Sequence, residues 1–177
     1  MKIKKIIVGP LATNCYLVAS DKEVGIIDPG DEAEKILTKI KKAKAKYIIL
    51  THYHFDHLGA AEKIKEETGA KILIHQAEKN FINFPIDQFI KENDKIKIGS
   101  EFLKVIHSPG HTKGSLCLLG KNEIFTGDLI FKNGYGRTDL AGGSSEDLRN
   151  SLKKLSCLLK ERMTIFPGHG EKFKFKK

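Results

Sequence analysis

The 177-residue sequence is poor in cysteine, and its three cysteines lie far apart. Cys15, Cys117 and Cys157 form no C-x-x-C pair, so their spacing predicts neither a disulfide framework nor a cysteine zinc site. This usage fits a reducing compartment. Because 40% of the residues are hydrophobic, a chain of this length can bury a core without disulfides. We expect a single domain over residues 1–177.

Long hydrophobic runs are absent as well. No apolar run approaches the roughly 20 residues that a membrane helix needs. The first one, residues 6–8, is broken by Gly9-Pro10 before the core of a signal peptide is reached. We therefore expect a soluble cytoplasmic protein without a membrane partner.

Arginine is scarce, although the formal net charge is +9. Lysine supplies most of the positive charge and is scattered along the chain, apart from a group at Lys41, Lys42, Lys44 and Lys46 and a tail at residues 172–177. Scattered lysines are typical of solvated faces, and the group lacks the interleaved aromatics of a nucleic-acid surface. Nucleic acid is therefore not the expected partner.

Short apolar runs bounded by Gly, Pro, Asn or Asp recur along the chain and predict strands. The predicted strands cover residues 3–8, 15–19, 24–28, 47–51, 71–75, 95–98, 102–107, 115–119, 124–127 and 164–167. Helical spacing occurs instead at residues 31–44, 57–68 and 145–161. This order predicts an α/β fold in which helices cover mixed sheets. The least regular stretch, residues 80–93, is expected to be a mobile loop over a site.

Three histidines and an aspartate lie within six residues directly after the strand predicted at 47–51. The segment reads His52-Tyr53-His54-Phe55-Asp56-His57. A strand end that leads into a helix leaves such side chains on a turn at the sheet edge, where they can converge on a ligand. Imidazole and carboxylate groups suit zinc, iron or manganese. Four donors at this spacing favour a metal site over an ordinary polar loop.

Three further fragments repeat this design, with a short apolar strand that ends in a polar donor beside glycine. They are residues 105–112, 124–128 and 164–170, and they contribute His111, Asp128 and His169. Seven donors exceed what one ion can use, because a catalytic zinc takes three protein ligands and keeps one position open. The sequence therefore predicts two metal ions.

The chain resembles the metallo-β-lactamase fold superfamily, and within it the small single-domain glyoxalase II-like hydrolases. The segments that carry the resemblance are Asn14-Cys15-Tyr16, Ile27-Asp28-Pro29-Gly30, residues 51–57, residues 109–115, Thr126-Gly127-Asp128, Gly136-Arg137-Thr138-Asp139 and Pro167-Gly168-His169. The resemblance implies a four-layer αββα sandwich of two mixed β-sheets flanked by helices, with the site at one edge of the sheets.

The resemblance also implies a ligand set for two divalent ions, Zn²⁺ being expected and Fe or Mn the alternatives. By this resemblance His52, His54 and His111 hold the first ion, Asp56, His57 and His169 hold the second, and Asp128 bridges both. Asp56 and Asp128 are also the expected catalytic carboxylates. Two ions about 3.5–4 Å apart share a hydroxide, which Asp56 would orient.

The segment from Gly134 to Asp139 is the expected substrate-binding loop. Glyoxalase II-like enzymes carry a basic residue there that contacts the glutathione carboxylate, so the resemblance implies an anion clamp at Arg137, beside Tyr135 and Gly136. Full glyoxalase II enzymes continue into a C-terminal helical domain, which we do not expect in this protein, because the sequence ends shortly after His169. The use of glutathione is therefore left open.

Three other polar residues are assigned to the scaffold. His75 and His107 follow apolar runs but fall on no ligand position of the family, so a structural role is expected for both. Asp28, in the turn Asp-Pro-Gly, is expected to support the histidine segment.

The expected function is a dinuclear metal-dependent hydrolase of a small thioester such as S-D-lactoylglutathione, or of a related ester. A mononuclear iron persulfide dioxygenase, which shares the Gly-Arg-Thr-Asp motif, is the alternative. A nuclease of this fold would suit the positive charge but needs a further domain or a long RNA-gripping arm. A binding protein with an inactive site is disfavoured, because no ligand position is missing.

Overall fold

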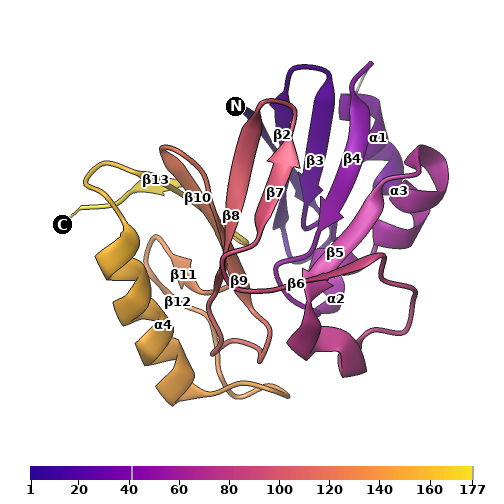
Figure 1. Cartoon of the computed structure of the whole chain (residues 1–177). Helices are drawn as coiled ribbons and strands as arrows, with labels where there is room; N and C mark the ends of the chain where they lie inside the picture. The colour runs from indigo at the N-terminus through magenta and orange to yellow at the C-terminus, as the bar shows by residue number, and fades with distance from the viewer. Residues whose placement is uncertain (41, 177) are drawn as a thin grey trace.

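Two facing β-sheets with helices on their outer sides make up the structure, a computed structural model that describes residues 1–40 and 42–176 (Figure 1). The strand order is β1-β2-β3-β4-β5-β6 in the first sheet and β14-β13-β10-β9-β8-β7 in the second. Lys41 and Lys177, which belong to the lysine group and the lysine tail noted above, lie outside the described residues.

The first sheet comes from the first half of the chain. Its strands are β1 (Lys2–Val8), β2 (Thr13–Ser20), β3 (Glu23–Ile27), β4 (Lys44–Ile49), β5 (Lys71–His75) and β6 (Gln88–Ile90). β1, β2 and β3 pair antiparallel, whereas β3, β4, β5 and β6 pair in parallel. Parallel pairing brings the carboxyl ends of β3, β4 and β5 to one edge, where open α/β sheets bind their ligands.

The second sheet comes from the second half. Its strands are β7 (Lys95–Ile98), β8 (Glu101–His107), β9 (Leu116–Leu119), β10 (Glu123–Gly127), β13 (Thr164–Pro167) and β14 (Phe173–Lys174). Only β10 and β13 pair in parallel within this described sheet. A short hairpin, β11 (Ile130–Phe131) and β12 (Gly134–Tyr135), follows β10.

The helices cover the outer faces of the two sheets. α1 (Ala33–Ile40) and α3 (Ala61–Thr68) lie on the first sheet, and α4 (Ser145–Leu158) lies on the second (Figure 1). The short α2 (Phe55–Leu58) and a 3₁₀ helix (Gln76–Phe81) follow β4 and β5. α4 begins where the side chain of Ser144 accepts a hydrogen bond from the N–H of Asp147, as an N-cap does.

Three layers of apolar side chains hold the sandwich together, because alternate residues of a strand face opposite sides of its sheet. Ile48 packs under α1 and α3, while its neighbour Ile49 faces the second sheet. Val105 likewise faces the first sheet, whereas Ile106 lies under α4. Each fully buried side chain of this kind contributes about 1.5–3 kcal/mol. The expected αββα sandwich of two mixed sheets is confirmed.

Each of the ten predicted strands is present, but the predicted helices need correction. The helix predicted at 31–44 is too long, because Lys44 already begins β4. The helix predicted at 57–68 is two helices, α2 and α3. The helix predicted at 145–161 ends at Leu158.

The irregular stretch at residues 80–93, which was predicted to be a mobile loop over a site, is not a loop throughout. It contains the end of the 3₁₀ helix and the edge strand β6. Among the described residues, no helix is both long and apolar enough to cross a membrane.

Candidate metal centre

The structure brings the seven donors singled out in the sequence to one edge of the two sheets. His52 and His54 lie in the turn after β4, and Asp56 and His57 lie in the first turn of α2. From the second sheet come His111, in the loop between β8 and β9, Asp128 directly after β10, and His169 directly after β13. The two halves of the chain therefore share the site.

His52, His54 and His111 form the first group of donors. Each offers one ligand atom, and these atoms lie within 4.8 Å of one another. His111 Nε2 is 2.9 Å from His54 Nδ1. This spacing suits three imidazoles that share one ion.

Asp56, His57 and His169 form the second group, again with ligand atoms within 4.8 Å of one another. His57 Nε2 lies 3.3 Å from His169 Nε2 and 3.5 Å from Asp56 Oδ2. Asp56 Oδ2 is 3.2 Å from His169 Nε2 and also accepts a hydrogen bond from the Thr13 hydroxyl at 2.9 Å.

Asp128 lies between the two groups. Its Oδ1 is 3.4 Å from His57 Nε2, and its Oδ2 is 3.7 Å from His111 Nε2 and 3.5 Å from His169 Nε2. One carboxylate thus faces donors of both groups.

Three of these side chains have buried atoms with no hydrogen-bond partner, namely His52 Nε2, His54 Nε2 and Asp128 Oδ1. A buried polar atom left unpaired costs about 1–3 kcal/mol. His52 and Asp128 belong, with His57, to one set of donors whose ligand atoms lie within 4.8 Å of one another, so an unpaired imidazole nitrogen and an unpaired carboxylate oxygen there fit a divalent cation. The donor set therefore fits the metal that the fold implies.

The other ring nitrogen of four histidines has a fixed partner. His57 Nδ1 is 2.9 Å from Asp28 Oδ2, and His52 Nδ1 is 3.0 Å from the Thr51 hydroxyl. The Nδ1 atoms of His111 and His169 donate to the carbonyl oxygens of Arg137 at 2.7 Å and of Leu11 at 3.0 Å. These contacts turn Nε2 of each ring toward the centre, as partners behind metal-binding histidines do.

The first strands also hold the segment that carries His169. The Asn14 Nδ2 donates to the carbonyl oxygens of Pro167 and Gly170, at 2.9 Å each. The Tyr16 hydroxyl donates to the same Pro167 oxygen at 2.6 Å. β2 therefore fixes the turn in which His169 lies.

The electrostatics differ between the two groups. Burial lowers the pKa of His54 to about 4 and that of His52 well below its ordinary value, so both rings are neutral. Burial also opposes charge on His169, but hydrogen bonds to Asp128 and Asp56 raise its pKa to about 10. Metal binding at the second group therefore has to displace a proton from His169.

The residues predicted to bind substrate lie in three different environments. The Arg137 guanidinium makes two hydrogen bonds of 2.7 Å to Asp139, and both side chains are exposed. Gly136 packs so closely on the Asp128 carbonyl oxygen that a side chain there would collide with it. Tyr135 is 63% exposed on the β11–β12 hairpin.

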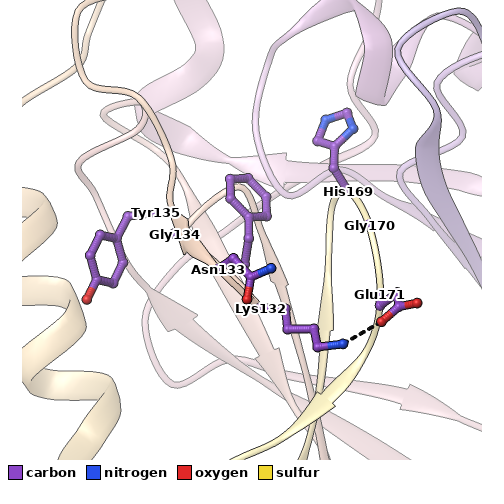
Figure 2. Close-up of a pocket in the computed structure, with 8 residues that line it drawn as sticks. Lys132, Asn133, Gly134, Tyr135, His169, Gly170 and Glu171 are labelled. Carbon is purple, nitrogen blue, oxygen red and sulfur yellow. Dashed lines mark hydrogen bonds and ion pairs between the residues drawn. The ribbon is translucent and has the colours of Figure 1, made fainter.

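A pocket of about 520 Å³ opens between the β11–β12 hairpin and the segment at residues 169–171. Figure 2 shows His169 at one end of it and the ion pair between Lys132 and Glu171 across it. Tyr135 also lines this pocket, so of the three predicted substrate-binding residues it is the one that borders open space beside His169.

His75 and His107 stand apart from the donor groups. Their rings stack at 4.0 Å with an angle of 9° between the planes. His75 Nδ1 accepts the N–H of Ala77, and His107 Nε2 donates to the carbonyl oxygen of Lys113. These hydrogen bonds tie both rings to the backbone of neighbouring segments.

Two residues that contact the site were missed in the sequence. Thr13 donates to Asp56, and the buried Glu78 accepts backbone N–H groups from Tyr53 and Gly114. Neither lies in a recognisable motif, and both act across long sequence separations. The sequence offered no local signal for them.

Comparison with known proteins agrees with this geometry. The profile of the Metallo-beta-lactamase superfamily matches residues 8–169. A probable metallo-hydrolase of Bacillus subtilis, YqgX, is 34% identical over 96% of this chain and 90% of its own length. A hydroxyacylglutathione hydrolase of Haemophilus influenzae, GloC, is 33% identical over 96% of this chain and 91% of its own length.

Solved structures share the fold over almost the whole chain. The B3 metallo-beta-lactamase BLEG-1 superposes with a TM-score of 0.92 at 31% identity, covering 98% of this chain and 94% of its own. The protein TTHA1623, solved in a di-iron-bound form, superposes with a TM-score of 0.86 at 29% identity, covering 97% and 94%.

Proposed function

The chain belongs to the metallo-beta-lactamase superfamily, and on that premise we propose that it is a dinuclear metal-dependent hydrolase of a small thioester or related ester. One observation carries the proposal. The Asp128 carboxylate faces His57 and His169 on one side and His111 on the other. A carboxylate that faces two groups of donors suits a site that holds two ions.

In this proposal His52, His54 and His111 hold the first ion, Asp56, His57 and His169 the second, and Asp128 both. Two ions held there would lower the pKa of bound water to about 7 and would polarise the substrate carbonyl. The identity of the ions is best tested between zinc and iron, since a similar protein has been solved with two irons.

The side chains of the protein supply the orientation. Asp28 fixes the ring of His57, and Thr13 fixes the carboxylate of Asp56. In this proposal Asp56 would accept a hydrogen bond from the attacking oxygen. Burial tends to raise its pKa, but contacts with His169, His57 and Thr13 lower it well below its ordinary value, so Asp56 is an acceptor at neutral pH.

A thioester is the proposed substrate class for two reasons. One relative carries the name hydroxyacylglutathione hydrolase. A leaving thiolate is also a soft, stable anion that needs no full proton from the protein. We assign substrate contacts to Tyr135, Arg137 and the backbone of Gly136, on the hairpin side of the centre.

The experiment is a metal and substrate panel on the purified protein. After reconstitution with Zn²⁺, Fe²⁺ or Mn²⁺, elemental analysis should approach two equivalents, and S-D-lactoylglutathione or a smaller thioester should be hydrolysed faster than phosphodiesters. A single iron, together with sulfite formation from glutathione persulfide, would replace the proposal with a dioxygenase.

A further inference from the structure

Glu78 is a fully buried carboxylate that the proposed chemistry does not use. It lies in the 3₁₀ helix that follows β5, and its exposed fraction is 0%. A charged side chain is almost never buried to this extent unless it is paired. Its partners therefore indicate what it does.

Both oxygens of Glu78 accept hydrogen bonds from backbone N–H groups. Oε2 accepts the N–H of Tyr53 at 3.0 Å, and Oε1 accepts the N–H of Gly114 in a short contact. Burial raises the pKa of Glu78 above its ordinary value, and hydrogen bonds from Gly114, Thr112 and Tyr53 oppose this shift. In each of these bonds the carboxylate is the acceptor, which is the role of its ionised form.

The two backbone groups belong to the two segments that carry the first group of donors. Tyr53 lies between His52 and His54, after a strand of the first sheet. Gly114 lies three residues after His111, in a loop of the second sheet. Glu78 is thus one side chain that bonds to both segments.

The loop around Gly114 is built for this contact. A Cβ at Gly114 would lie 2.5 Å from Glu78 Cγ, so only glycine lets the carboxyl group approach the backbone. On the same loop the Ser115 hydroxyl accepts the N–H of Thr112 at 3.0 Å and lies 2.7 Å from the Thr112 hydroxyl. Hydrogen bonds within the loop therefore hold the segment after His111 at the point where Glu78 contacts it.

We propose that Glu78 is a positioning residue that sets the distance between the His52–His54 segment and His111, and thereby the affinity of the first metal ion. The inference rests on the proposed function only in taking these three histidines as ligands of that ion. It predicts an effect confined to one of the two ions, which a general loss of stability does not produce.

The test is a titration of the metal-free protein with Zn²⁺ against a chromogenic chelator, repeated with Co²⁺ to follow the visible spectrum. In Glu78→Gln one acceptor oxygen becomes an NH₂ group that faces a backbone N–H. The affinity of the first ion should fall about 10- to 100-fold, while the second ion binds as in wild type. Gly114→Ala, which displaces the same carboxyl group from the other side, should give the same pattern.

Two controls separate positioning from stability. Ile36→Val lowers stability in the core under α1, away from either segment. Asp87→Asn removes a carboxylate that accepts the N–H of Ile72 at 2.8 Å, the same kind of bond at the other end of β5. Thermal unfolding of each metal-free variant is measured alongside, and both controls should bind two ions like wild type. Glu78→Asp is the second variant if Glu78→Gln does not fold.

Two results would overturn the proposal. One is an unchanged affinity for both ions in Glu78→Gln. The other is an equal fall in the affinity for both ions that follows the fall in the unfolding temperature. A wild-type protein that binds a single ion would overturn the dinuclear function instead. In that case His54→Ala and His169→Ala show which donor group holds the single ion, by which variant loses it. The effect of Glu78→Gln on the affinity of that ion then tests the role of Glu78.

Discussion

Asp28 Oδ2 lies 2.9 Å from His57 Nδ1, and both side chains are almost completely buried. The same carboxylate accepts the N–H and the hydroxyl of Thr51, at 2.8 and 2.7 Å. Thr51 directly precedes His52. One side chain at the end of β3 therefore orients both the end of the β4 segment and a ring in α2.

Asp28→Asn should weaken binding of the second ion about 10- to 100-fold, because the amide cannot accept from all of its present donors. Asparagine is the suitable replacement, since Asp28 has a φ of 51° and asparagine tolerates this left-handed backbone. Titration with Zn²⁺ measures the effect. Unchanged affinity for both ions would show that the contact with His57 is dispensable.

Asp128→Ala should reduce occupancy of both ions, since this carboxylate faces both donor groups. Asp56→Ala should mainly lose the second ion, because Asp56 contacts only donors of that group. Elemental analysis of the reconstituted variants measures the equivalents retained. Full metal content and near wild-type hydrolysis in Asp128→Ala would contradict the bridging role.

Arg137→Ala should raise the KM for S-D-lactoylglutathione several-fold at unchanged metal content, with kcat altered much less, the pattern of lost uniform binding. Asp139 accepts two hydrogen bonds from the Arg137 guanidinium and would compete with the substrate carboxylate for it. Asp139→Asn should therefore lower this KM, and Arg137→Lys should recover only part of the loss, because an ammonium lacks the planar fork.

An uncharged thioester is the control substrate for the Arg137 and Asp139 variants, because it offers no carboxylate to the guanidinium. There the KM should hardly respond to Arg137→Ala or to Asp139→Asn. An equal loss on both substrates would point to disruption of the loop, and equal kinetics of wild type and Arg137→Ala on the glutathione thioester would remove the anion clamp.

His75 should make the metal-free protein less stable in acid. Burial, followed by the neighbouring His107, lowers its pKa to about 4, and Glu92 and Asp94 act in the opposite direction. In the unfolded chain His75 takes up a proton near pH 6.5. The contribution of the neutral, folded His75 to the free energy of unfolding is therefore fully present above about pH 6.5 and is lost as the pH falls toward 4. Allowing for solvent screening, the contribution is on the order of 1–2 kcal/mol.

Chemical unfolding of the metal-free protein at several pH values tests this prediction, with wild type compared with His75→Gln. The variant should show a flatter dependence between pH 7 and 4.5. It should also bind metal like wild type, as should His107→Ala, because both rings lie outside the donor groups. A variant with the same slope as wild type would assign the acid sensitivity to other groups.

The convergence of the seven donors was predictable because each follows a strand end that periodicity identifies. Asp128 and His169 come after β10 and β13, which pair in parallel and so end at one edge of the second sheet. His52 comes after β4, which pairs in parallel with β3 and β5 in the first sheet. The order of strands within each sheet was not predictable in the same way, because it depends on contacts between distant segments.

Other features escaped because tertiary contacts override local signals. α2 begins at Phe55 although its N-cap, His54, makes no side-chain capping bond, so the turn is held by its surroundings instead of by a cap. β6 and the β11–β12 hairpin are too short to show periodicity. Glu78 and Gly114 are 36 positions apart in the sequence, and no local sequence pattern around either residue predicts their hydrogen bond.

The hydrogen bonds from Asn14 and Tyr16 to the Pro167 carbonyl oxygen affect the order in which the contacts of the site can form. These hydrogen bonds join residues that are 153 and 151 positions apart. β2 can therefore bind the turn at His169 only after almost the whole chain has been synthesised. Contacts of such separation form late in folding. During translation, histidines 52, 54 and 111 emerge well before His169 does. The second donor group therefore cannot be complete before the segment around His169 has been synthesised, whereas all three residues of the first group precede it in the chain.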